Sequence, residues 1–145
     1  MATPAPRAGL VIRYSYLWRA EQRLGREEGV KDRPCAILLC VEDNPRGARV
    51  VVLPVTHAPP SNAAHAIEIP ITTKRRLGLD DARSWIVLTE ANRFTWPGPD
   101  VRHVKSGEPS GFSYGELPAK LYEQVRRQWL ALHAARRTEL VMRTE

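Results

Sequence analysis

The sequence predicts a single, mainly β domain with one C-terminal α-helix. Its length of 145 residues suits one domain with its own core, so residues 1–145 are expected to form one unit. Several short runs rich in β-branched and aromatic residues are separated by residues that favour turns. Near the C-terminus, apolar residues recur at three- and four-residue steps, as on one face of a helix: Leu117, Leu121, Val125, Trp129 and Leu132.

The β portion is expected to span about residues 9–104. Its first strand is predicted over residues 9–18, which are rich in β-branched and aromatic side chains. Residues 19–32 are almost all polar or charged and contain two glycines, so they are interpreted as a long connection. Connections of this length are usually functional or disordered.

Residues 33–41 and 49–56 are predicted to form a hairpin, because Pro45 and Gly47 between them supply turn geometry. Further strands are predicted over residues 66–71, 84–89 and 101–104. Pro70 cannot donate to a ladder, which places the first of these three strands at an edge. Residues 74–79 are interpreted as one helical turn, and the β portion is expected to end by residue 104.

Two cysteines, Cys35 and Cys40, lie in the first strand of this hairpin. Five strand steps separate them by roughly 16 Å, and the odd spacing predicts opposite faces. A mutual disulfide needs Cα atoms within about 7 Å, so both are expected to be small buried hydrophobes.

The C-terminal helix is predicted over about residues 118–136, with Pro118 at its first position. An alternative start uses Ser113 and Glu116 as a capping box, but it leaves the proline inside the helix. Residues 136–145 are expected to fray.

The formal net charge of +6 and the isoelectric point of about 9.8 favour polyanionic partners without identifying one. No apolar run is long enough for a secretory signal or a membrane span, so a cytoplasmic location is expected. His65 and His103 are isolated in the sequence, and no zinc-binding spacing is present. Neither a metal nor a cofactor is therefore predicted.

Four patterns follow one another along the chain. A strand that opens with Gly9 precedes Gly29-Val30-Lys31-Asp32-Arg33-Pro34, which is followed by Leu53-Pro54-Val55-Thr56 and the C-terminal helix. In this order they resemble the MazF/PemK family of toxin–antitoxin ribonucleases, over roughly residues 9–132. The Arg-Pro pair before an apolar strand and the Pro-x-Thr pattern are the most specific parts.

This resemblance implies an SH3-like β-barrel of the CcdB/PemK kind with a helix packed on it, usually as a homodimer. It implies a growth-inhibiting toxin that cuts single-stranded RNA sequence-selectively without a metal, and a cognate antitoxin as a second partner. The family's arginine before proline and its threonine after the third strand belong to the active site. The matching positions are Arg33 and Thr56.

One position departs from the family pattern. PemK-type relatives place an acidic residue and an arginine close together near the fifth strand, where this chain has Val87 and Thr89. Glu90 and Arg93 replace them only if the strand ends or bulges there and turns both side chains toward the groove. On this reading Glu90 is a third catalytic residue and Arg93 contacts RNA.

Metal-free RNA cleavage uses the 2′-hydroxyl of the substrate as nucleophile, so the protein must move protons and stabilise charge on phosphorus. The planar guanidinium of Arg33 suits the second task, because it holds two phosphate oxygens and stays charged. Thr56 can donate a hydrogen bond to phosphate. Glu90 or His57 can carry protons if the surroundings bring its pKa toward neutrality.

The remaining candidates are contacts for RNA. Trp18 and Trp96 are expected to stack on splayed bases. Three cations, Lys31, Lys74 and Arg75, are expected to contact the phosphate backbone.

Other interpretations remain open. Arg33 can instead form an ion pair at the loop edge with Glu27, Glu28 or Asp32. A non-catalytic toxin on the same barrel, such as a gyrase-poisoning toxin of the CcdB kind, is the main rival, because a fold does not determine a function. A domain that docks RNA or protein without cutting is the third, and the missing acidic residue at Thr89 favours it.

Overall fold

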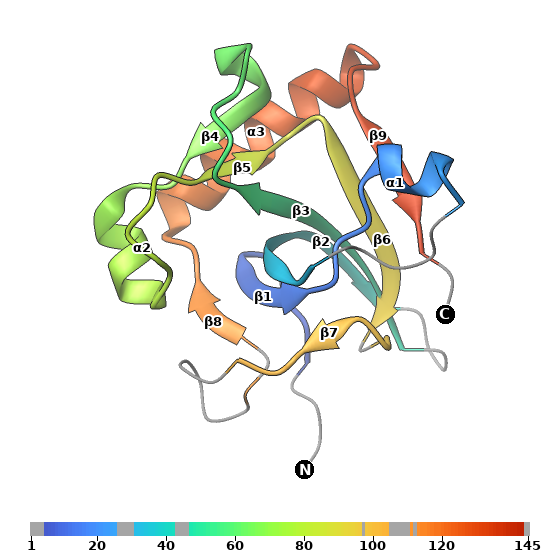
Figure 1. The fold of residues 1–145 in the computed structure, drawn as a ribbon, viewed down its shortest axis with the longest axis horizontal. Coiled ribbons are helices and arrows are strands. Elements are labelled where there is room, and N and C mark those ends of the chain that lie inside the picture. The colour runs from blue at the N-terminus through green and yellow to red at the C-terminus, as the bar shows by residue number, and fades with distance from the viewer. Residues whose placement is uncertain are drawn as a thin grey trace.

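The computed structural model describes residues 5–25, 31–42, 47–96, 98–104, 111 and 113–143, and within them nine strands form one sheet (Figure 1). The prediction of a mainly β protein with a C-terminal helix is confirmed. Within the same residues, no helix is both long and apolar enough to span a bilayer. In chain order the elements are β1 (Leu10–Tyr14), α1 (Arg19–Arg23), β2 (Arg33–Glu42), β3 (Ala48–Thr56), the 3₁₀ turn Ala63–His65, β4 (Ala66–Glu68), α2 (Ile71–Leu77), β5 (Trp85–Val87), β6 (Glu90–Trp96), β7 (Val101–Arg102), β8 (Ser113–Glu116), α3 (Ala119–Ala134) and β9 (Glu139–Met142).

The strand order is β4-β5-β3-β2-β1-β7, with β6 also beside β3, β8 beside β1, and β9 beside β6. All of these pairs are antiparallel except β6 and β9, which run parallel. Among the described strands the pairings do not return to their starting strand, so the sheet is open. β3 is central, because its first part pairs with β6 and its last residues, Val55 and Thr56, pair with β5.

The predicted hairpin is confirmed, because β2 and β3 pair antiparallel from Cys35 opposite Pro54 to Glu42 opposite Ala48. The expected turn at residues 43–46 lies outside the described part of the chain. Gly47, just after it, has a φ of +97°, which a residue with a side chain rarely adopts.

The two cysteines do not lie on opposite faces as expected. The register of β2 against β3 slips between Ile37 and Leu39, so one extra residue stands in β2. Alternation restarts after this bulge. As a result Cys35 and Cys40 pack against the same apolar cluster, and neither forms a disulfide among the described residues.

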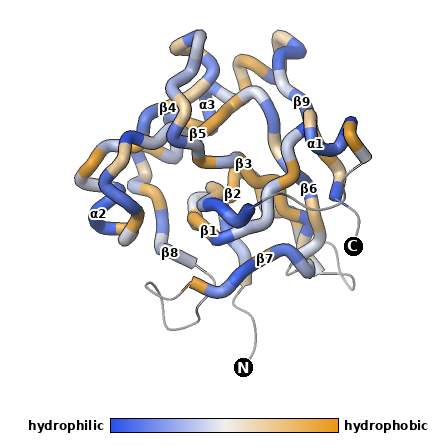
Figure 2. Tube along the Cα trace, viewed as in Figure 1, coloured by the Kyte–Doolittle hydropathy of each residue, from blue (hydrophilic) through white to orange (hydrophobic). Residues whose placement is uncertain are grey.

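Two apolar clusters form the core, and the hydrophobic segments of the chain lie mainly along the central strands (Figure 2). One cluster includes strand residues and three side chains of α3, namely Leu121, Val125 and Trp129. The other comes mainly from β1, β2, β3 and β6 and contains no residue of the three α-helices. Burial of each such leucine or valine side chain contributes about 1.5–3 kcal/mol, so both faces of the sheet stabilise the fold.

The C-terminal helix is confirmed, with Pro118 as its N-cap and its last residue at Ala134. The alternative capping box is not formed, because Ser113 and Glu116 lie in β8. The predicted fraying of residues 136–145 is wrong for residues 139–142, and residues 144 and 145 lie outside the described part of the chain. Residues 139–142 form β9, and the side chain of Val141 is fully buried in the core.

Several boundaries differ from the predictions. The expected connection after β1 contains α1, a helix of 5 residues with no buried side chain. β4 ends at Glu68, and Pro70 caps α2 instead of lying in the strand. α2 begins at Ile71, earlier than the expected turn at residues 74–79. β6, β8 and β9 were not predicted.

Candidate active site

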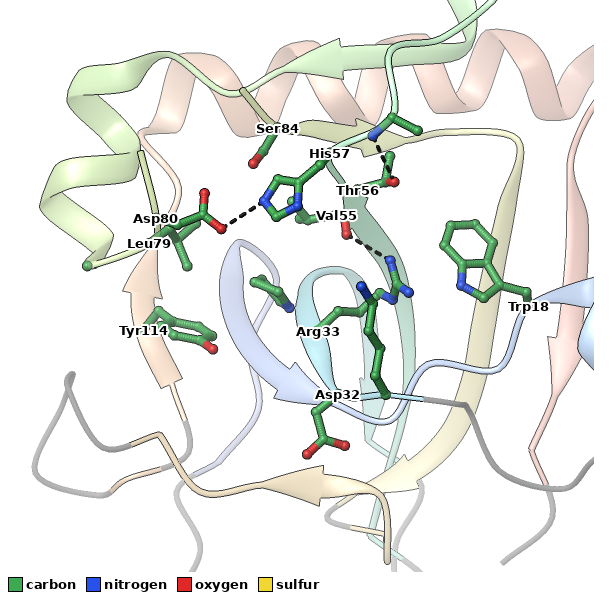
Figure 3. A pocket seen from close by; sticks show the side chains of 14 residues that line it. Trp18, Asp32, Arg33, Val55, Thr56, His57, Leu79, Asp80, Ser84 and Tyr114 are labelled. Carbon is green, nitrogen blue, oxygen red and sulfur yellow. Dashed lines mark hydrogen bonds and ion pairs between the residues drawn. The ribbon is translucent and has the colours of Figure 1, made fainter. Parts of the chain in front are cut away.

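Five of the predicted site residues line one pocket of about 500 Å³ between the ends of β2 and β3, the residues before β2 and the loop after α2 (Figure 3). These residues are Trp18, Lys31, Arg33, Thr56 and His57.

Strand register brings the two family-matched residues together. Arg33 begins β2, and Thr56 ends β3. Cys35 is opposite Pro54, and the same register continued by two residues sets Arg33 opposite Thr56. Opposite residues on paired strands project from the same face, so both side chains reach the same pocket.

Arg33 is held by weak, replaceable contacts. Its Nη1 donates to the carbonyl oxygen of Val55 at 3.4 Å, and its guanidinium carbon lies 4.9 Å from the ring centre of Trp18. Its Nε is buried and has no partner among the described residues. The guanidinium thus keeps capacity to bind an anion in the pocket.

The ion pair considered as an alternative for Arg33 is not formed with Asp32. That carboxylate lies 3.5 Å from Arg13 and 3.4 Å from Arg102 instead. The other two acidic residues considered, Glu27 and Glu28, lie outside the described residues.

Thr56 presents a hydroxyl that is already oriented. Its Oγ1 accepts a hydrogen bond from the backbone N–H of Ala58 at 3.2 Å. A hydroxyl has one donor and two acceptor lone pairs, so this bond leaves its proton to donate elsewhere. Thr56 is therefore suited to contact an oxygen of a bound phosphate.

His57 forms a pair with Asp80, a residue that was not predicted. The His57 Nε2 lies 2.7 Å from Asp80 Oδ2 (Figure 3). An ionised carboxylate only accepts, so Nε2 carries the ring proton and Nδ1 is the nitrogen that can take one up. Gly78, in the left-handed conformation at a φ of 71°, ends α2 and starts the turn that brings Asp80 to the pocket.

Asp80 is anchored by a hydrogen bond from a buried lysine. Lys74 Nζ lies 2.6 Å from Asp80 Oδ1, and the backbone N–H of Ala82 donates to the same oxygen at 3.2 Å. The hydrogen bond from Lys74, and a smaller effect of His57, hold the pKa of Asp80 below its ordinary value despite partial desolvation. Asp80 is thus kept as a carboxylate that accepts from the imidazole.

Two of the cations expected to bind RNA lie outside the pocket lining. Lys74 is buried, with its ammonium bound by Asp80, the Ser84 hydroxyl and the Ala82 carbonyl. It has no donor left for a phosphate, so the expected backbone contact does not fit its surroundings. Arg75 is exposed on α2.

Glu90, expected to be catalytic, is not among the residues that line the pocket. It is partly buried at the start of β6, where its Oε2 accepts from the backbone N–H of Arg19 at 2.9 Å. Burial raises the pKa of Glu90 and nearby Glu139 adds to this, whereas the Arg19 amide opposes it.

The other two expected RNA contacts also lie elsewhere. Trp96 is buried in the core cluster without helical residues. Arg93 lines a second pocket, of about 360 Å³, together with residues of α3 and β9. The predicted strand over residues 84–89 does end, because β5 stops at Val87 and β6 begins at Glu90, but neither Glu90 nor Arg93 lines the first pocket.

Comparison of the chain with protein-family models, with curated proteins and with solved structures finds no significant match. In the described part of the chain, no group of three or more His, Cys, Asp or Glu side chains is placed to hold a metal ion.

Proposed function

We propose that this protein is a metal-independent endoribonuclease of the MazF/PemK type that cuts single-stranded RNA as the toxin of a toxin–antitoxin system. The observation that carries the proposal is the meeting of Arg33, Thr56 and His57 in one pocket. The fold class that goes with it is the SH3-like barrel of that family. The nine-stranded sheet, with α3 packed on one of its two apolar clusters, supports this finer class.

Arg33 and Thr56 are assigned to the phosphate. The guanidinium binds two phosphate oxygens and offsets the charge that grows on them as phosphorus becomes five-coordinate. The Thr56 hydroxyl donates to one of those oxygens. The contacts of Arg33 support this assignment, because the single long hydrogen bond to Val55 and the contact with the Trp18 ring leave other N–H groups of the guanidinium to bind phosphate.

His57 is assigned to the proton. Its Nδ1 takes the proton of the 2′-hydroxyl while O2′ forms a bond to phosphorus and the bond from phosphorus to the 5′-oxygen breaks. The 5′-oxygen leaves with a proton from solvent at the open side of the pocket. The products are a 2′,3′-cyclic phosphate and a 5′-hydroxyl end. The pair with Asp80 supports this role, because it fixes the tautomer that the step needs.

Trp18 is assigned to a base beside the cleaved bond. Its ring lies at the pocket next to Arg33, and a second aromatic ring, that of Tyr16, holds it edge to face at 5.0 Å between centres. Stacking needs a base splayed out of a helix, which favours single-stranded RNA. Lys31 and the net charge of +6 favour the polyanion in general.

The direct test is cleavage of a single-stranded RNA by purified protein in EDTA. We expect cutting of RNA, no cutting of DNA of the same sequence, and a cyclic phosphate on the product, because the nucleophile is the 2′-hydroxyl. Arg33→Ala is expected to lower the rate by about 10²–10³, as for removal of one donor to a developing oxyanion. Arg33→Lys keeps the positive charge but not the forked pair of N–H donors, so it should retain only part of the cleavage rate.

A non-catalytic barrel that docks RNA or protein is the alternative, and the position of Glu90 outside the pocket favours it. The same samples separate the two. RNA that stays intact but binds the protein, with binding weakened by Arg33→Ala, would overturn the nuclease and support docking.

The proposal includes a cytoplasmic location and two partners: a second copy of the chain and an acidic antitoxin. The second pocket supports an association surface, because exposed Leu39, Val41 and Leu140 line it beside Arg49 and Arg93. Covering these side chains would remove apolar area from water. Sedimentation of the purified protein measures whether it is a dimer, and Val41→Asp is expected to shift any dimer toward monomer.

A further inference from the structure

Lys74 is the buried member of the described lysines, with only 1% of its side chain exposed. Its Nζ has three oxygen partners: Asp80 Oδ1 at 2.6 Å, Ser84 Oγ at 2.7 Å and the carbonyl of Ala82. An ammonium has three N–H donors, so each partner can accept one hydrogen bond. Burying the ammonium of a lysine costs free energy unless such partners replace its hydration. An apolar side chain would fill the same space without that cost.

A role in holding the loop together explains only part of this arrangement. The Ala82 carbonyl and the Ser84 hydroxyl tie α2 to the segment before β5 by themselves. The third hydrogen bond joins the buried ammonium to the carboxylate of Asp80, whose side chain is 55% exposed. The other oxygen of that carboxylate faces His57 in the pocket.

The two oxygens of Asp80 therefore have different surroundings. Oδ1 accepts from Lys74 Nζ and from the backbone N–H of Ala82. Oδ2 accepts from His57. A pair between an exposed histidine and an exposed aspartate is weak and mobile by itself, because water competes for both groups. An anchored Oδ1 removes that freedom, because the carboxylate plane is then fixed.

We propose that Lys74 is a positioning residue of this site, which fixes Asp80 so that His57 keeps its proton on Nε2 and presents Nδ1 as proton acceptor. This inference rests on the proposed function, in which His57 Nδ1 takes the proton of the 2′-hydroxyl. Lys74 acts through Asp80 and does not touch the substrate.

Asp80→Asn tests the arrangement with Lys74 in place. An amide has one oxygen and one NH₂ group, and both Lys74 and the Ala82 N–H are donors, so the oxygen must face them. The NH₂ group then faces His57, whose proton must move from Nε2 to Nδ1. Ring ¹⁵N chemical shifts of the free protein measure this tautomer. With Nδ1 blocked, kcat is expected to fall on the order of 10- to 100-fold with KM nearly unchanged.

Lys74→Met tests the anchor itself, because methionine fills much of the space without a charge. We expect a mixture of His57 tautomers, a fall in kcat, and a smaller effect of Asp80→Asn in this background than in the original protein. Lys120→Met is the matched control, because Lys120 is exposed on α3, and it should change neither the tautomer nor kcat.

The inference is overturned if His57 keeps its proton on Nε2 in Asp80→Asn, or if folded Lys74→Met leaves the tautomer and kcat as they were. If Lys74→Met does not fold, the tautomer in Asp80→Asn decides alone, because that side chain is exposed. The ¹⁵N measurement needs no RNA. Failure of the original protein to cut RNA therefore defeats the proposed function, and the tautomers still decide the role of Lys74.

Discussion

Two buried cations, Lys74 and Arg143, are each paired with an aspartate, and the two pairs differ in how exposed the aspartate is. The carboxylate that pairs with Lys74 has 55% of its side chain exposed, whereas Asp100, which pairs with Arg143, has 9%. The second oxygen of the first carboxylate, that of Asp80, accepts a hydrogen bond from the imidazole of His57 in the pocket. A buried charge pair with an exposed end can thus position a reacting group.

The second pair is enclosed by the core. Besides Asp100, Arg143 donates to the hydroxyl of Tyr14 and the carbonyl of Ser15, and it lies 5.3 Å from the Tyr14 ring centre. These contacts join the end of β9 to β1, and none of the four residues is among those that line the pocket. Changes at the exposed pair should therefore alter chemistry, and changes at the enclosed pair should alter stability.

The largest effect is expected at the exposed pair. His57→Ala removes the proposed proton acceptor, so the cleavage rate at saturating RNA should fall by about 10²–10⁴ while the thermal midpoint stays nearly the same. His65→Ala is the control, because His65 lies in the 3₁₀ turn before β4 and is not among the pocket residues. Equal rates for the two variants would remove His57 from the mechanism.

Arg143→Met should show the opposite pattern. It leaves Asp100 without its buried cation, and breaking a buried pair in this way costs about 3–5 kcal/mol of unfolding free energy. Urea unfolding measures the loss. Cleavage per folded molecule is expected to stay within about twofold of the original, since neither Arg143 nor Asp100 is among the residues that line the pocket. A variant that unfolds normally but fails to cleave would contradict the separation.

A smaller effect is expected at Trp18, which is proposed to stack on a base of the RNA. Trp18→Ala should weaken RNA binding by about 1–3 kcal/mol, the amount that one stacked base contributes in single-strand binders. Trp18→Phe keeps a ring and should lose less. Fluorescence anisotropy with labelled RNA measures both. A change in kcat without a change in affinity would assign Trp18 to holding Arg33 instead of binding a base.

The smallest effects concern pH, and they have opposite signs for two carboxylates. The lowered pKa of Asp80 gives stability that is present above the unfolded value of about 3.9 and is lost as pH falls. The raised pKa of Glu90 gives a contribution that is present below about 4.3 and is lost as pH rises through its folded pKa. Asp80→Asn should therefore reduce the loss of stability on acidification, and Glu90→Gln the loss toward neutral pH.

Urea midpoints measured from pH 3 to pH 7 check both directions. If the pH dependence of the urea midpoint changed in the same direction in both variants, the opposite pKa shifts of Asp80 and Glu90 would be contradicted. Loss of cleavage in Glu90→Gln as large as in His57→Ala would return Glu90 to the site.

The fold was predictable where local pattern and core packing agree. β2 and β3 are regular apolar runs around a turn, and α3 carries a clear apolar stripe. β6 was missed because it contains Asn92, which is fully buried yet satisfied by the backbone N–H and carbonyl of Leu17, each at 2.8 Å. β9 was missed because only Val141 of its four residues is buried.

The site was predictable only in part for a similar reason. Arg33 and Thr56 came from the family resemblance, and His57 from its chemistry beside them. Asp80 is 23 residues from His57, and the turn at Gly78 that brings it back has no pattern specific to a histidine partner. A polar residue in a loop gives no sign of which distant residue it will meet, so this contact required the structure.

The parallel pairing of β9 with β6 sets an order on assembly. Glu90 and Arg93 pair with Glu139 and Met142, so one edge of β6 stays uncovered until α3 and the residues after it have been synthesised. An uncovered edge offers unpaired amides and carbonyls to other chains. The nascent protein therefore passes through a stage in which its sheet is open to association, and a shortened C-terminus would make that stage permanent.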